Sequence, residues 1–105
     1  MKMTRITVDL PASVAPFARD LEFFLQVMVR KLHTNRHKGF AEGADVSSLL
    51  DGLDNERGEL GLALLTLGQF ESAVEAADVA NMAFLVFSRL MAMDKVQYTK
   101  ERDAL

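Results

Sequence analysis

Apolar residues recur along this chain with the spacing of amphipathic helices, after a short N-terminal stretch that follows a different pattern. Residues 1–12 alternate apolar and polar side chains, which is typical of an extended arm or a short edge strand. From Ser13, a plausible N-cap, the period changes and predicts a helix to about His33. Its apolar positions are Val14, Phe17, Leu21, Phe24, Leu25, Met28, Val29 and Leu32. We therefore divide the chain into an N-terminal extended arm, residues 1–12, and one helical domain, residues 13–105.

A second helix follows a polar, basic segment. The segment at 33–43 contains two glycines and no apolar periodicity, so we interpret it as a loop. Asp45, Ser47 or Ser48 can cap the helix that comes next, because each offers a side-chain oxygen to the first free backbone N–H groups. The apolar pattern then predicts a helix to about Leu67.

A third helix begins after a short turn. Gly68 is a typical helix stop, and the next helix is expected to start near Phe70 or Glu71 and to run to about Met93. The charged tail at 94–105 is expected to form a short helix or to fray. The predicted fold class is all-α: an antiparallel bundle of three long helices plus a short C-terminal helix.

The second and third predicted helices carry apolar residues over most of their circumference. On the second helix these are Leu60, Leu62, Leu64, Leu65 and Leu67, and on the third they are Met82, Ala83, Phe84, Leu85, Val86 and Phe87. A monomer of three or four helices cannot bury both faces of such helices. We therefore expect a homo-oligomer, a dimer or a tetramer, to complete the bundle.

Composition removes several classes of protein from consideration. The chain has 105 residues, is 50% hydrophobic and carries a net charge of −3, which argues for one folded domain and against disorder. Without cysteine it has no disulfide, no thiolate metal site and no cysteine nucleophile. No uninterrupted apolar run reaches the roughly 18 residues of a membrane span, and Arg5 and Asp9 interrupt any signal-like segment. The mild acidity disfavours a nucleic-acid polymer as partner. We expect a cytoplasmic protein.

Four acidic residues occupy related positions on the two predicted helices. Glu56 and Glu59 are three residues apart on the second helix, and Glu75 and Asp78 are three apart on the third, so each pair shares one helical face. If the helices form an antiparallel hairpin about position 67, Glu59 lies level with Glu75 and Glu56 with Asp78. The sequence thus predicts four neighbouring carboxylates.

Such a group of acids needs a cation to offset its repulsion. Oxygen ligands alone suit Mg²⁺, or Mn²⁺, better than zinc. The competing interpretation is a solvated acidic face. Gly52, Gly58 and Gly61 also interrupt the second helix, each at a cost of roughly 1 kcal/mol relative to Ala. They indicate close approach of another backbone or a ligand, with helix–helix contact as the favoured explanation.

The spacing of the acids resembles that of a known family. Glu56-x-x-Glu59 followed by Glu75-x-x-Asp78 is similar to the EExxE…ExxD signature of the MazG-like, all-α nucleoside triphosphate pyrophosphohydrolases, many small members of which come from phages or bacteria. The basic segment that begins at Lys31 is similar to the one before helix two in these proteins. The resemblance covers roughly residues 14–93. Asn55 stands where the family often has the first Glu.

This resemblance implies an activity, a cofactor and a set of site residues. The activity is Mg²⁺-dependent hydrolysis of a (deoxy)nucleoside triphosphate between its α- and β-phosphates, giving the monophosphate and pyrophosphate. The resemblance implies that Glu56, Glu59, Glu75 and Asp78 hold the metal, and that Glu56 or Glu59 takes a proton from the attacking water. For a phage-encoded member the location would be the host cytoplasm.

Five further residues are candidates for substrate binding. Lys31 and Lys38 can bind phosphate, and Asn35 can add a polar contact, although cations at a helix end also favour the helix dipole. Phe40 can stack on a base or anchor the loop. Asn81 lies one turn after Asp78 and can reach a ribose or phosphate oxygen.

Two other functions remain open at this point. One is a non-enzymatic all-α interaction or adaptor module, in which the acids form only a surface patch. The other is a di-iron carboxylate bundle, which normally requires Glu-x-x-His pairs that Glu59 and Asp78 do not supply.

Overall fold

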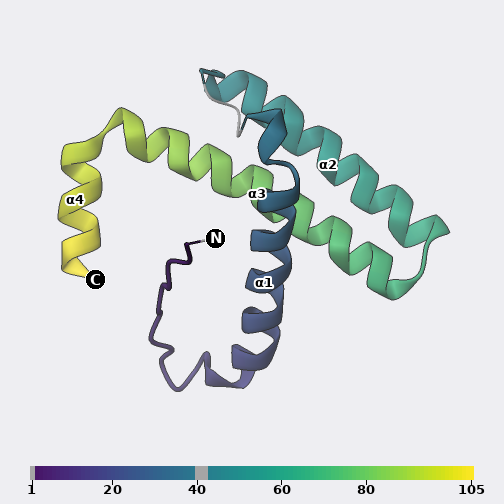
Figure 1. Ribbon diagram of the computed structural model, residues 1–105, viewed down its shortest axis with the longest axis horizontal. Coiled ribbons are helices and arrows are strands. Elements are labelled where there is room, and N and C mark those ends of the chain that lie inside the picture. Colours follow the sequence, from purple (N-terminus) through teal and green to yellow (C-terminus); the bar gives the residue numbers. More distant parts are fainter. Residues whose placement is uncertain (1, 40–42) are drawn as a thin grey trace.

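The computed structural model describes residues 2–39 and 43–105, and every regular element in these ranges is helical (Figure 1). The predicted all-α class is therefore confirmed, and the tail at 94–105 forms a helix. The elements in chain order are η1 (Ala15–Phe17), α1 (Ala18–Thr34), η2 (Arg36–Lys38), α2 (Val46–Thr66), α3 (Gln69–Met93) and α4 (Lys95–Ala104).

The first helix starts later than its apolar pattern predicts. Ser13 is not its N-cap, because a 3₁₀ turn, η1, precedes α1. Pro16 lies within this turn. A proline is tolerated there because its missing N–H falls among the donors that a first turn leaves unpaired. Residues 2–10 form neither helix nor strand, and Met3, Ile6 and Val8 are largely exposed along them.

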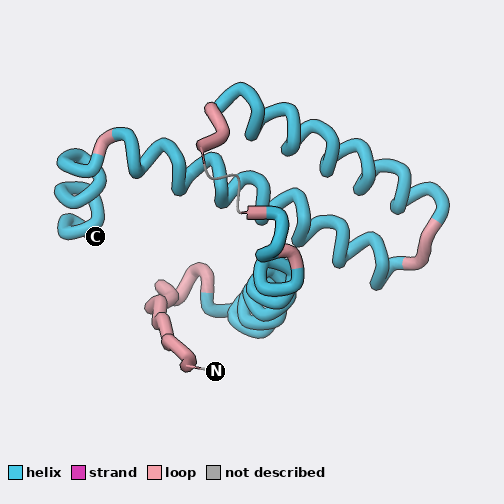
Figure 2. Tube along the Cα trace, turned by 45° about the horizontal axis from the view of Figure 1, so that its top comes forward, coloured by secondary structure: helices cyan, strands magenta, loops and turns pink. Residues whose placement is uncertain are grey.

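The α2–α3 hairpin agrees closely with its prediction. The Asp45 carboxylate accepts a hydrogen bond from the Ser48 backbone N–H at 2.8 Å, so Asp45 is the N-cap of α2. The two helices run antiparallel side by side in both views (Figures 1 and 2). A Cβ placed on Gly52 would lie 2.6 Å from the terminal methyl of Met82. These two residues are equidistant from position 67, which is the register that the sequence predicted.

Helix α1 lies across this hairpin rather than alongside it as a third parallel rod. It packs on α3, and its C-terminal half passes over the middle of that helix (Figures 1 and 2). The Asn81 side-chain amide of α3 donates a hydrogen bond to the Met28 carbonyl of α1 at 3.1 Å. Side chains from α1 are thereby brought to the face of α3 that also carries Asp78.

Helix α4 turns sharply away from the end of α3. Asp94 caps it by accepting a hydrogen bond from the Gln97 backbone N–H at 3.1 Å. The turn forms an elbow, and α4 contacts the last part of α3 (Figure 1).

The core of the single chain is thin. Its buried apolar residues in the described ranges are Leu49, Ala63 and Ala77, two of them alanines. The accessible surface is 8701 Å², whereas a compact monomer of this mass exposes about 5,900 Å². The radius of gyration is 15.5 Å, against about 13 Å for a compact domain of this length. Much apolar surface that a compact monomer would bury therefore remains uncovered.

One helix is apolar enough to be considered as a membrane span. By length and composition α3 passes this test, with a mean hydropathy of 1.3 over an 18-residue window of which 11% is buried. Glu75 and Asp78 are both half-buried on this helix. The expectation that the chain does not cross a membrane stays a prediction.

Candidate metal centre

Three carboxylates converge where α2 meets α3. One oxygen from each of Glu56, Glu75 and Asp78 lies within 4.8 Å of the other two, and all three residues are half-buried. The hairpin register causes this convergence, because Glu56 is level with Asp78 while Glu75 lies one turn away on the same helix. The structure thus brings together three of the four acids that the sequence singled out.

The two glutamates of this cluster each bury an oxygen that receives no hydrogen bond. Glu56 Oε2 and Glu75 Oε2 have no hydrogen-bond partner among the described residues. Burial, followed by the neighbouring charges of Glu59, Asp78 and Glu75, raises the pKa of Glu56 from 4.5 to about 7. Buried acceptors without donors are costly, so these carboxylates would be stabilised by a bound cation.

Glu59 occupies a different position from the other three acids. It is exposed and lies outside the group of converging oxygens, although it is near enough to contribute to the raised pKa of Glu56. It follows Glu56 by three residues, a step of 300° that leaves its side chain about 60° around the helix from that of Glu56, and at this position it is exposed.

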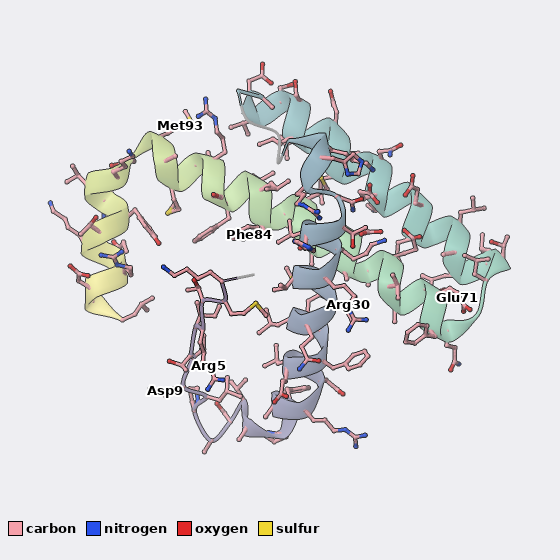
Figure 3. The ribbon with its side chains drawn as sticks, viewed as in Figure 1. Arg5, Asp9, Arg30, Glu71, Phe84 and Met93 are labelled. Carbon is pink, nitrogen blue, oxygen red and sulfur yellow. The ribbon has the colours of Figure 1, made fainter. Side chains whose placement is uncertain are left out.

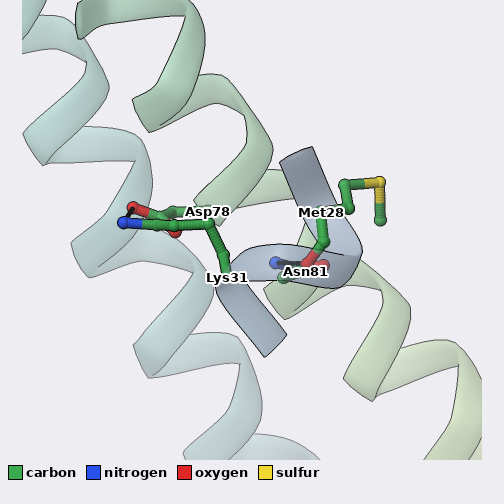
Figure 4. A network of polar contacts seen from close by, with 4 residues as sticks. All are labelled: Met28, Lys31, Asp78 and Asn81. Carbon is green, nitrogen blue, oxygen red and sulfur yellow. Dashed lines mark hydrogen bonds and ion pairs between the residues drawn. The ribbon is translucent and has the colours of Figure 1, made fainter. Parts of the chain in front are cut away.

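A cation from α1 already meets the cluster. Lys31 Nζ lies 3.4 Å from Asp78 Oδ2, as Figure 4 shows. Beside this pair the Asn81 amide reaches the Met28 carbonyl, while Asn81 Oδ1 is buried and has no partner within residues 2–39 and 43–105. The ion pair and the hydrogen bond both fix α1 on α3 beside the acids.

A pocket of about 280 Å³ opens between α1 and the acidic cluster. Most of the residues that the sequence proposed for metal or substrate binding line it. They are Lys31, Asn35, Lys38, Glu56, Asp78 and Asn81. Its apolar wall, which the sequence analysis did not anticipate, consists of Leu32, Met82 and Leu85. Met82 and Leu85 follow Asp78 by four and seven residues, and this spacing places them on the same helical face as Asp78 and could have predicted their position.

Two expectations from the sequence have different outcomes. Phe40 lies outside the residues that the structure describes. Of the three glycines on α2, Gly52 contacts Met82. A Cβ placed on Gly58 or Gly61 would face open space, with no described atom beyond the local helix backbone within 4 Å. Close approach within the described part of the chain therefore explains Gly52 but neither of the other two.

Comparison with known proteins adds no further assignment. No family model, curated protein or solved structure matches this chain. The resemblance to the MazG-like family accordingly stays a prediction from the spacing of the acids.

The chemistry of the cluster fits a small divalent cation. Magnesium is bound through oxygen ligands, and Glu56, Glu75 and Asp78 each offer one carboxylate oxygen within 4.8 Å of the other two. The two orphaned oxygens, Glu56 Oε2 and Glu75 Oε2, are suitable ligands. Three protein ligands leave other coordination positions for water and substrate oxygens, an arrangement that Mg²⁺ favours.

Proposed function

We propose that this protein is a Mg²⁺-dependent nucleoside triphosphate pyrophosphohydrolase that converts a (deoxy)nucleoside triphosphate to its monophosphate and pyrophosphate. The observation that carries the proposal is the convergence of Glu56, Glu75 and Asp78 beside a pocket that Glu56 and Asp78 line together with Lys31 and Lys38. Metal-binding acids facing phosphate-binding cations are what a polyphosphate substrate requires. Mn²⁺ is a plausible substitute for Mg²⁺ in an all-oxygen site.

The three converging carboxylates hold the metal in this proposal. Bound there, the ion supplies polarisation of phosphoryl oxygens and a lower pKa for the attacking water. Metal binding also offsets the burial and the repulsion that together raise the pKa of Glu56, so it favours the ionised form of this carboxylate.

The basic residues of α1 and η2 bind the phosphates. Lys31 is held by Asp78 at 3.4 Å and remains about one third exposed, so its ammonium group can turn toward a phosphate oxygen in the pocket. Lys38 and Asn35 line the same pocket and supply a second charge and an amide. Asn81 contributes through α1, because its hydrogen bond to Met28 keeps Lys31 next to the acids.

Glu59 is our candidate for the general base. It lies beside Glu56 but outside the three converging oxygens, so our proposal assigns it the proton of the attacking water. The water oxygen forms a bond to phosphorus at one side of the α–β bridge while its proton passes to Glu59. The bond between that phosphorus and the bridging oxygen breaks, and the bridging oxygen leaves with the electron pair on the departing group.

A direct assay tests this proposal. The protein is incubated with Mg²⁺ and a panel of ribo- and deoxyribonucleoside triphosphates, and the products are separated by ion-exchange chromatography. We expect monophosphate and pyrophosphate in equal amounts, no turnover with Asp78→Asn, and unchanged turnover with Asp54→Asn, an exposed acid on α2. Glu59→Gln is expected to lose turnover while still being stabilised by Mg²⁺.

A non-enzymatic adaptor module is the second candidate, and the large uncovered apolar surface favours it. The assay separates the two functions. Absence of turnover on every nucleotide, together with no rise in melting temperature on addition of Mg²⁺, would leave the adaptor function standing and remove the enzyme.

A further inference from the structure

Asn81 on α3 carries a polar atom that no contact within the described residues accounts for. Its side-chain Nδ2 donates a hydrogen bond to the Met28 carbonyl of α1 at 3.1 Å, but its Oδ1 is buried and receives no hydrogen bond from the described part of the chain. The residue as a whole is only 7% exposed. Burial of an acceptor without a donor is costly, so an atom of this kind in a folded protein calls for a partner. Asn81 also lines the pocket between α1 and the acids, which is where a ligand would bind.

The orientation of this amide determines which ligand group can meet it. A backbone carbonyl only accepts hydrogen bonds, so the atom that faces Met28 must be the NH₂ group and the remaining atom must be Oδ1. Oδ1 in turn only accepts, and its partner must carry a proton. The oxygens of a fully ionised triphosphate carry none, so they cannot satisfy this atom. Within a nucleotide, the groups that can are the sugar hydroxyls and the N–H groups of the base.

The apolar wall of the pocket favours the base over the sugar. Leu32 of α1 and Met82 and Leu85 of α3 form this wall and are half-buried, so each keeps part of its surface open. The faces of a heterocyclic ring need no hydrogen bonds, whereas each hydroxyl of a sugar would lose its hydrogen bonds to water against such side chains. The exposed Phe84 belongs to another surface, because Figure 3 shows it on the side of α3 that faces the space between α1 and α4.

We propose that Asn81 recognises the nucleobase of the substrate. Its Oδ1 accepts a hydrogen bond from an N–H group at the edge of the base, and the three residues of the apolar wall pack against the ring. The inference rests on the proposed function, because that function makes a nucleotide the ligand of this pocket. An exocyclic amino group, as in adenine or cytosine, and a ring N–H, as in uracil or guanine, both supply the donor.

The position of Asn81 along α3 fits this division of the pocket. Asn81 follows Asp78 by three residues, which is a rise of about 4.5 Å along the helix. The base would therefore lie about one turn beyond the proposed metal ligand, while Lys31, which contacts Asp78, stays beside the phosphates. Met82 and Leu85 follow Asn81 on the wall of the same pocket, so the lining from α3 becomes apolar with distance from the acids.

The two contacts of Asn81 determine how the experiment is designed. Replacing it by alanine removes both the proposed contact to the base and the hydrogen bond to α1, so lower affinity alone would not identify base recognition. Ligands that differ by one donor separate the two effects. Loss of the contact to α1 weakens both members of such a pair equally, whereas loss of the contact to the base removes the difference between them.

Equilibrium binding of matched nucleotide pairs tests the proposal. All ligands are α,β-methylene triphosphates, which the proposed reaction does not cleave, and binding is measured by calorimetry in the presence of Mg²⁺. The first pair is adenosine and purine riboside, which lacks the amino group of adenine. The second pair is uridine and uridine methylated on its ring N–H, and the third is adenosine and 2′-deoxyadenosine. We expect the wild type to bind the member with the N–H roughly tenfold more tightly in the first or the second pair, and to bind the members of the third pair equally.

Matched variants assign this difference to Asn81. Asn81→Ala should bind both members of every pair with nearly equal affinity, because the acceptor is gone. Gln26→Ala, which removes an exposed amide on α1 outside this pocket, should keep the tenfold difference. If Asn81→Ala fails to fold, Asn81→Leu takes its place, because leucine has a similar volume and lacks the acceptor.

The outcomes separate this inference from the proposed function. A protein that shows the difference within a pair but cleaves no natural triphosphate would refute hydrolysis and leave base recognition standing. Base recognition is overturned if the wild type binds both members of the first two pairs equally, which would assign Oδ1 to solvent water, or if only the 2′-deoxy pair differs, which would assign it to the sugar. It is also overturned if the difference persists without Asn81, or if no analogue binds at all.

Discussion

Replacing Glu56 by Gln should stabilise the metal-free protein and at the same time abolish its response to Mg²⁺. Burial and three neighbouring carboxylates raise the pKa of Glu56 to about 7, so at pH 8 the folded protein must carry a charge that its surroundings disfavour. Glutamine has nearly the same shape as the protonated acid and never ionises. The same substitution removes one of the three converging carboxylates that we propose as metal ligands.

The size of the gain follows from the pKa. A change from 4.5 to about 7 corresponds at full value to roughly 3 kcal/mol. Glu56 is only half-buried, so solvent screening reduces this figure, and we expect about 1–2 kcal/mol at pH 8. For a domain of this size that is a rise of roughly 5–10 °C in melting temperature. At pH 5 the folded wild-type protein already holds the proton, so the gain should nearly vanish there.

Thermal melts at one fixed protein concentration measure both the gain in stability and the response to Mg²⁺. They are recorded at pH 5 and pH 8, each with and without roughly 5–10 mM Mg²⁺, which is enough to saturate a weak site. Glu22→Gln, an exposed acid on α1, is the matched control and should behave as the wild type. The reasoning is refuted if Glu56→Gln melts below the wild type at pH 8 without metal, or if Mg²⁺ stabilises the variant as much as it stabilises the wild type.

Three further predictions concern neighbouring features of the chain. Because the pKa of Glu56 is raised, the folded state binds up to one more proton than the unfolded state between about pH 4.5 and 7. The free energy of unfolding of the metal-free protein, measured in urea, should therefore fall with rising pH by less than ~1.4 kcal/mol per pH unit. Adding Mg²⁺ should reduce this dependence on pH. Lys31→Met should cost no more than about 1 kcal/mol of stability but raise the KM for the triphosphate roughly tenfold with kcat retained, whereas Lys100→Met in the tail should leave KM unchanged. Gly58→Ala should raise the free energy of unfolding in urea by about 0.5–1 kcal/mol, because no described neighbour lies within 4 Å of the new methyl group. Gly52→Ala should raise it less, because the new Cβ would lie 2.6 Å from the Met82 methyl. A lower free energy of unfolding for Gly58→Ala would indicate that another chain packs there.

Local patterns predicted the parts of the fold that local physics determines. The cap at Asp45 follows from a side-chain oxygen that acts within one turn, and the short turn at Leu67 and Gly68 separates α2 from α3. The register of the hairpin follows from its short turn, and with it the meeting of Glu56 and Asp78. These features involve residues joined by short stretches of chain, so one sequence contains enough information to place them.

The orientation of α1 could not be predicted in the same way. Its apolar stripe shows which side is buried but not where along α3 it crosses, because that depends on how the two surfaces fit. The ion pair between Lys31 and Asp78 and the hydrogen bond between Asn81 and Met28 both depend on this crossing. The exposed position of Glu59 was missed for a related reason. The hairpin register predicts how far each residue lies from the turn, but it does not predict whether the side chain points toward the other helix or toward solvent.

The surroundings of helix α3 account for the apolar residues on most sides of it. It carries Glu75 to the converging carboxylates at α2 and presents Asp78 and Asn81 to α1, so two of its sides are occupied within the chain. The remaining side carries Phe84 and Phe87, which are exposed, and the homo-oligomer expected from the sequence would bury apolar surface there. The acids and the rings lie about two turns apart on one helix, which makes the metal centre and the expected association separable by substitution: Asp78→Asn should leave association intact, and Phe87→Asp should leave the metal response intact. If both properties instead failed together in either variant, the proposed metal centre would require the second copy for its own geometry.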